Sequence, residues 1–114
     1  MYLLCYNLFG DANLEVSEIL QLVQKSMKDG NYDMVPTPKN RNSRRKYGLT
    51  LNDIEDLIFS LNEGNLVKGP EIDRDFPGEE LFIFKKEIYC NVVFYIKLKF
   101  KDNQIKILSC HEDE

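Results

Sequence analysis

Metal ligands and disulfide partners are scarce in this chain. Its 114 residues include only three cysteines, Cys5, Cys90 and Cys110, and a single histidine, His111. The cysteines are odd in number and none is spaced as C-x-x-C, which favours reduced thiols over a disulfide or zinc framework. One imidazole without a thiolate cluster also argues against a transition-metal site. We therefore expect neither a metal nor a cofactor.

Long apolar runs are missing too. No stretch approaches the roughly 20 residues that a membrane helix requires. The first ten residues, M-Y-L-L-C-Y-N-L-F-G, lack the basic start and the small-residue cleavage site of a signal peptide, and they could form either a short strand or an arm on the core. We therefore expect a cytoplasmic protein with no membrane partner.

The chain also lacks an excess of positive charge. Its 15 basic and 19 acidic residues give a net charge of −4, which argues against a protein that holds nucleic acid by bulk electrostatics. The charges are nevertheless segregated. Residues 39–46, K-N-R-N-S-R-R-K, hold five basic groups and no acid, and a second basic set lies between Lys85 and Lys106.

What is present is the composition of a folded domain. Hydrophobic residues at 43% and charged residues at 30% are typical of globular proteins, and we expect residues 1–114 to form one domain. Apolar residues at helical spacing predict a helix over residues 13–29, which begins at Asp11 or Asn13 and ends at Asp29-Gly30. This apolar stripe consists of Val16, Ile19, Leu20, Val23 and Met27.

A second helix is predicted over residues 51–62. Thr50 is its N-cap, Asp53 can reach back to the first turn, and Gly64 can stop it. The segment before the basic run contains Pro36 and Pro38, which predict an extended or edge segment. By composition the basic run itself is expected to be an exposed loop, and residues 65–80, with two prolines and two glycines, a second one.

Three strands are predicted in the last third of the chain. They span residues 81–86, 92–100 and 104–110, and Asp102-Asn103 forms the turn between the last two. The fold class is therefore α+β, with a C-terminal antiparallel sheet covered by two to three N-terminal helices.

The middle strand has a polar face that carries Tyr95, Lys97 and Lys99. Such a face is either the solvated outside of a half-buried sheet or an anion-binding surface for a phosphodiester backbone. A two-residue turn at Asp102-Asn103 pairs Tyr95 with Cys110 and directs His111 to the core. A three-residue turn or a bulge instead sets Tyr95 opposite His111, and we predict this second register if the two act together.

Several segments of the chain resemble one known family. The segments K-G-P at 68–70, D-R-D-F-P-G-E, L-F-I-F, F-Y-I-K-L-K and S-C-H-E-D-E, in this order of helices and strands, resemble the MqsR family of type II toxin–antitoxin toxins, within the RelE-like superfamily. The likeness covers about residues 14–114 and is most specific over 49–112.

The resemblance implies a RelE-like fold and a stress-response ribonuclease that cuts messenger RNA without a metal, either free or on the ribosome, under the control of a cognate antitoxin protein. It assigns the catalytic site to Lys68, Tyr95, Lys97 and His111. In this hypothesis His111 is the general acid, Tyr95 positions the substrate or acts as base, and the two lysines stabilise the phosphate. Expected RNA-backbone contacts are Arg41, Arg44, Arg45, Lys46, Arg74 and Lys99.

The acidic net charge supports an alternative. In this second hypothesis the chain is a non-catalytic regulator, such as a phage or mobile-element protein, that keeps the same fold and uses its acidic surfaces to bind a protein partner.

Overall fold

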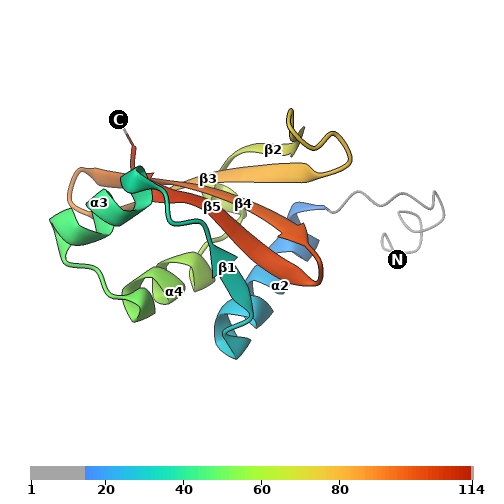
Figure 1. The fold of residues 1–114 in the computed structure, drawn as a ribbon. Helices are drawn as coiled ribbons and strands as arrows, with labels where there is room; N and C mark the ends of the chain where they lie inside the picture. Colours follow the sequence, from blue (N-terminus) through green and yellow to red (C-terminus); the bar gives the residue numbers. More distant parts are fainter. Residues whose placement is uncertain (1–14, 114) are drawn as a thin grey trace.

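The computed structural model describes residues 15–113, which form an α+β fold with three helices and a five-stranded sheet (Figure 1). This confirms the predicted fold class. The helices are α2 (Val16–Asp29), α3 (Pro38–Tyr47) and α4 (Leu51–Phe59), with a short 3₁₀ turn, η1 (Glu63–Asn65). The strands are β1 (Tyr32–Met34), β2 (Leu66–Ile72), β3 (Glu80–Tyr89), β4 (Val92–Lys101) and β5 (Gln104–Glu112).

The strand order in the sheet is β1-β5-β4-β3-β2. Strands β3 to β5 pair antiparallel, as predicted, and β2 adds antiparallel to β3, but β1 pairs with β5 in parallel, so the sheet is mixed. The physical reason is the connection: β1 lies early in the chain, and α3, α4 and three strands intervene before β5 returns beside it.

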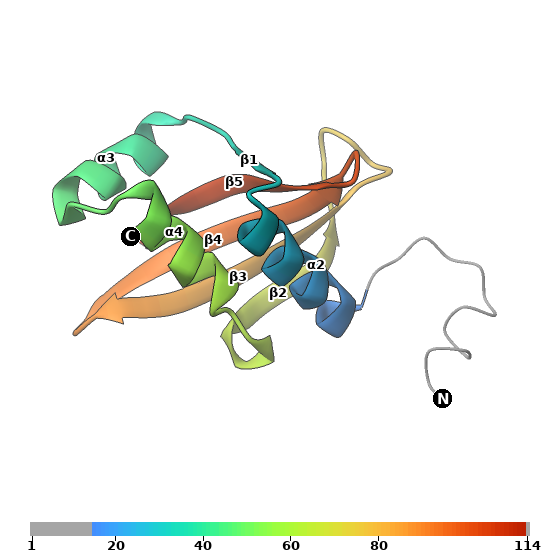
Figure 2. The same cartoon turned by 90° about the horizontal axis from the view of Figure 1, so that it is seen from below.

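One face of the sheet carries the hydrophobic core. Helices α2 and α4 lie side by side across this face (Figure 2). Three alternating positions of β4, Phe94, Ile96 and Leu98, are fully buried there, together with most of the apolar stripes of both helices. The largest of these buried side chains include Ile19, Val23, Ile54, Ile58, Phe84, Phe94, Ile96 and Leu98.

The predicted helix signals are confirmed at two ends. Gly30 closes α2 in the left-handed conformation with φ of 70°. At the start of α4 the Thr50 hydroxyl accepts from the Asp53 N–H, and the Asp53 carboxylate accepts from the Thr50 N–H. The predicted stop at Gly64 is wrong, because α4 ends at Phe59 and Gly64 lies in η1. The predicted N-cap residues of the first helix, Asp11 and Asn13, lie outside the described residues, as do the first ten residues of the chain.

The basic run is a helix, α3, and the expectation of a loop is wrong. Thr37 accepts from the Asn40 N–H, Pro38 occupies the first helical position, and Gly48 ends the helix with φ of 63°. These caps can be seen in the sequence, but the run has no apolar stripe. Its two buried residues, Asn40 and Ser43, are polar and accept hydrogen bonds from the backbone of β5, while Tyr47 at its end packs against Phe94 of the core.

The expected loop over residues 65–80 contains strand β2, an edge strand with two register shifts. An edge tolerates Pro70 because its outer side requires no backbone donor. Gly69, with φ of 130°, allows β2 to lie close to β3, since a Cβ at this position would be 2.7 Å from the Leu81 carbonyl oxygen. Only residues 73–79 form the loop.

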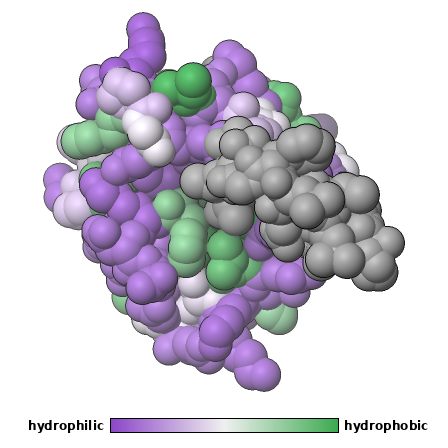
Figure 3. Space-filling view, turned by 90° about the vertical axis from the view of Figure 1, so that its right-hand side faces the viewer, coloured by the Kyte–Doolittle hydropathy of each residue, from purple (hydrophilic) through white to green (hydrophobic). Residues whose placement is uncertain are grey.

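The surface of the described part is mostly polar. Figure 3 shows a hydrophilic face with a small group of hydrophobic residues near its centre. Within residues 15–113, no helix is long and apolar enough to cross a membrane.

Candidate functional site

A β-bulge in β5 decides which face of the sheet His111 occupies. The turn at Asp102-Asn103 is the tight two-residue one, with Lys101 opposite Gln104. The register then shifts by one residue at Leu108. Beyond this bulge Tyr95 lies opposite His111, which confirms the register predicted for a pair that acts together.

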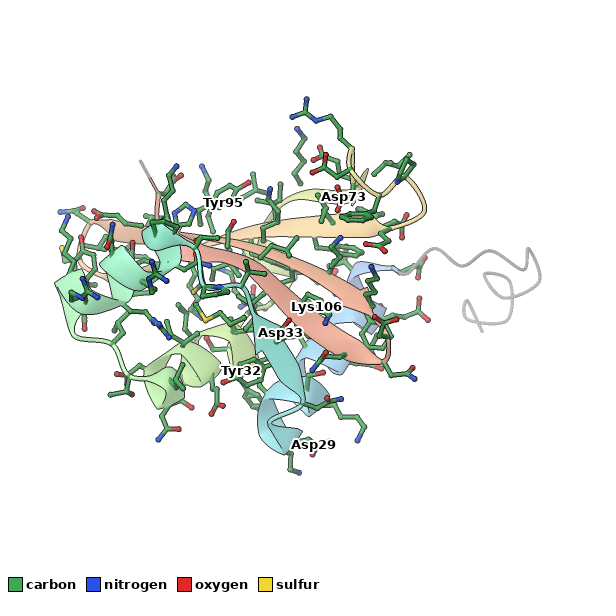
Figure 4. All side chains as sticks on the ribbon, in the orientation of Figure 1. Asp29, Tyr32, Asp33, Asp73, Tyr95 and Lys106 are labelled. Carbon is green, nitrogen blue, oxygen red and sulfur yellow. The ribbon has the colours of Figure 1, made fainter. Side chains whose placement is uncertain are left out.

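Tyr95 and His111 stack on the open face of the sheet. Their ring centroids lie 5.5 Å apart with an interplanar angle of 21°. Figure 4 shows Tyr95 on the side of the sheet opposite α2 and α4. The His111 Nδ1 atom lies 3.0 Å from the Glu112 carbonyl oxygen. Because a carbonyl can only accept, Nδ1 carries the hydrogen, and Nε2 is left to exchange a proton.

The stacked pair lines a cavity of about 560 Å³ between the sheet and the start of α3. Among residues 15–113, Lys97 has no carboxylate partner, so its ammonium group can meet an anion in this cavity. The lining residues are Thr37, Pro38, Lys39, Tyr95, Lys97, Ser109, His111 and Asp113.

Two further cavities adjoin the first and share lining residues with it. One of about 600 Å³ lies beside β2 and the loop at 73–79 and shares Lys97. A smaller one of about 180 Å³ lies beside α3 and shares His111. Through these shared residues the three cavities follow one another from α3 to the loop at 73–79, and we call them together the depression of the open face.

Lys68 reaches the outer cavity but not the one that holds the stacked pair. Its Nζ lies 2.9 Å from a Glu71 carboxylate oxygen. The hydrogen bond that the Lys68 ammonium donates to Glu71 raises the pKa of Lys68, and the field of Tyr95 adds to this. The structure therefore places Lys68 near the predicted site with its charge already balanced.

Lys99 is not available to RNA, and its predicted role is wrong. It is only 5% exposed, and its Nζ lies 2.7 Å from Asp73 and also bonds Glu79. Burial alone would lower the pKa of Lys99, but the hydrogen bonds that it donates to the two carboxylates raise it overall. The alternation of side chains along β4 predicts that Lys99 lies on the open face of the sheet. It does lie on that face, but the loop at 73–79 covers it.

The same loop positions Arg74. Asp73 makes an ion pair with Lys99 through one oxygen, and its other oxygen accepts from the Asp75 N–H at 2.9 Å. Arg74 is exposed and lines the outer cavity, where it can reach a phosphate.

Helix α3 divides the basic run between two faces. Lys46 lines the smaller cavity, with its Nζ 2.8 Å from Glu112. Lys39, which was not among the predicted contacts, lines both this cavity and the central one. The predicted contacts Arg41, Arg44 and Arg45 line none of the three cavities. Helical spacing from Lys46 would have identified Lys39, had the run been predicted as a helix.

The central cavity brings together a phenol, an imidazole and an ammonium group. Such a set can move protons and stabilise negative charge on a phosphoryl group. No cluster of three or more potential metal ligands occurs in the part of the chain that the structure describes.

A scan of the chain against protein-family models gives no match, and a search of curated proteins gives none either.

Proposed function

We propose that the chain is a metal-independent endoribonuclease of the RelE-like, MqsR type, which cuts messenger RNA as the toxin of a type II toxin–antitoxin pair. A cognate antitoxin would then be its protein partner. The observation that carries the proposal is the Tyr95–His111 stack in the cavity that also contains Lys97.

The residues of the cavity can supply each step of RNA transesterification. The 2′-hydroxyl loses its proton to a base, the O2′–P bond forms, and the P–O5′ bond breaks. His111 donates a proton to the leaving 5′-oxygen from Nε2, and Tyr95 holds the imidazole and positions or deprotonates the nucleophile. Lys97 stabilises the charge on the phosphorane, with Lys68 at the rim. The products are a 2′,3′-cyclic phosphate and a 5′-hydroxyl.

The shape of the depression supports a single-stranded substrate. It continues from the α3 side past Lys97 to Arg74, so more than one nucleotide can lie along it. A strand with splayed bases can stack on exposed aromatic rings and place its phosphates against the lysines.

The test is cleavage of single-stranded RNA by the purified protein in the presence of a chelator. We expect products with cyclic phosphate ends, and a loss of about 10²- to 10⁴-fold in rate for His111→Ala, because general acid–base catalysis contributes about this much. Asn52→Ala, an exposed change on α4 at a residue that lines none of the three cavities, is the matched control. Equal rates for the parent and His111→Ala would remove the proposal.

A second function, the non-catalytic protein-binding regulator, has its own supporting observation. Lys68, Lys85, Lys99 and Lys101 of the open face, and Lys46 of α3, are paired with carboxylates, which limits the field available to RNA. Expression of the chain in a bacterial host separates the two proposals. Growth arrest that His111→Ala abolishes supports the ribonuclease, whereas a harmless, folded parent supports the regulator.

A further inference from the structure

On the side of β5 where β1 pairs with its first residues, helix α3 forms hydrogen bonds with its last residues. Strand β1 stops at Met34, and its last contact with β5 is the hydrogen bond from the Val35 N–H to the Ile107 carbonyl. Beyond Ile107 the backbone of β5 requires other partners on that side. Two polar side chains of α3 provide them, from Asn40 and Ser43.

Asn40 bonds the backbone on both sides of the bulge. Its Oδ1 accepts from the Cys110 N–H at 2.9 Å, and its Nδ2 donates to the Leu108 carbonyl at 3.3 Å. Nδ2 also donates to the Val35 carbonyl at 2.8 Å, which ties the end of β1 to the same point. The side chain is 1% exposed, so water does not compete for these hydrogen bonds.

The bulge that Asn40 holds is the feature that brings His111 onto the open face. With the observed two-residue turn and no bulge, Tyr95 would lie opposite Cys110, and His111 would point toward the core. A bulge leaves an extra residue out of the ladder, so it depends on partners from outside the sheet. Asn40 supplies them at the Leu108 carbonyl and the Cys110 N–H.

We propose that Asn40 is a positioning residue of the site: its amide fixes the bulge at Leu108 and so keeps the His111 imidazole stacked on Tyr95. The expected effect on catalysis rests on the proposed function. The geometric part of the inference, that Asn40 fixes the bulge and the position of the His111 imidazole, concerns the fold alone.

The single histidine makes the geometric part measurable by NMR. In the parent, stacking on the Tyr95 ring shifts the imidazole Cε1–H and Cδ2–H signals upfield, and Tyr95→Leu gives the reference values without the ring. We expect Asn40→Ala and the isosteric Asn40→Asp, which removes both Nδ2 donations, to move these signals most of the way to that reference. Asn52→Ala, an exposed change on α4 at a residue that lines none of the three cavities, should leave them unchanged.

The catalytic part is tested by RNA cleavage with the same variants. We expect kcat to fall at least tenfold with little change in KM, since Lys97 and Lys68 keep their places. A folded Asn40 variant with unshifted imidazole signals would overturn the proposal. Loss of the folded state in both variants, judged by circular dichroism, would indicate a general structural role and would also overturn it. If the imidazole signals shift in the Asn40 variants but the parent protein cuts no RNA, the positioning role of Asn40 stands and the ribonuclease proposal fails.

Discussion

At the residue scale, the basic side chains differ in whether they already form an ion pair with a carboxylate. Lys68 is paired with Glu71, Lys46 with Glu112 and Lys85 with Asp113. Within the described residues Lys97 has no such partner, and it lies where two cavities meet. Under the proposed function, a substrate phosphate would meet Lys97 without first breaking an ion pair, whereas it would compete with Glu71 for Lys68.

Glu71→Gln should strengthen RNA binding. The change releases the Lys68 ammonium and removes a negative charge from the outer cavity. Since the pair is exposed and worth little by itself, we expect only about a two- to fivefold lower Kd. Binding can be measured with an uncleavable 2′-O-methyl RNA.

Glu63→Gln in the η1 turn, outside all three cavities, is the control for the loss of one acidic charge. An equal gain in affinity from both changes would indicate that net charge alone acts, and that Lys68 does not contact RNA.

At the element scale, the loop at 73–79 is fastened to the open face by one buried cation. Lys99 bonds Asp73 at the start of the loop and Glu79 at its end, and Lys101 lies 2.9 Å from the second oxygen of Glu79. The ring of Phe76 lies 4.9 Å from the Nζ atoms of both lysines. The loop is therefore held at its two ends and its centre, and it presents Arg74 to the outer cavity.

This fastening should make stability fall in acid. Hydrogen bonds from Lys99 lower the pKa of both Asp73 and Glu79, so their contribution is present at neutral pH and is lost as the pH falls through the depressed folded-state values. The pKa of Lys99 is raised, so its contribution is complete at neutral pH and is lost only at strongly alkaline pH. Lys99→Met should therefore lower the Tm clearly at neutral pH and much less near pH ~3.

The measurement is thermal unfolding of the parent and the variant across this range of pH. Lys106→Met is the matched control, because that lysine meets Asp33 at 3.5 Å near the opposite edge of the sheet. A Tm difference for Lys99→Met that stays constant down to acid pH would show that the carboxylates do not stabilise the loop.

At the scale of the whole molecule, charge limits how tightly RNA can be held. The net charge is −4, and the ion pairs of the open face leave few cations for phosphates. Affinity for a single strand then depends on a small number of contacts, and recognition requires shape and stacking in addition to charge.

The salt dependence of binding should accordingly be shallow. Each phosphate that a cation neutralises contributes about −0.7 to the slope of log K against log salt for single strands. With two or three such contacts we expect a slope of about −1.4 to −2.1 for an uncleavable RNA, reduced by about 0.7 in Lys97→Ala. A slope near −5 or steeper would contradict this picture of the surface.

Much of the architecture was predictable because the signals are local. The apolar stripes of α2 and α4, the capping box at Thr50 and the alternation along β4 each depend on residues a few positions apart. Strand β2 was missed because glycine and proline usually mark loops, and here they lie in an edge strand. Of the four residues assigned to catalysis, three line the central cavity, Tyr95, Lys97 and His111.

The sequence by itself therefore determined the fold class, the three long strands and the polar face that bears Tyr95 and Lys97. Only the tertiary structure decided that the basic run is a helix, that Lys99 is buried, and that His111 shares a face with Tyr95. The physical reason is sequence distance. The bonds that decide these features join Asn40 to β5 and Lys99 to Asp73 and Glu79, residues far apart in the chain that only the folded sheet brings together.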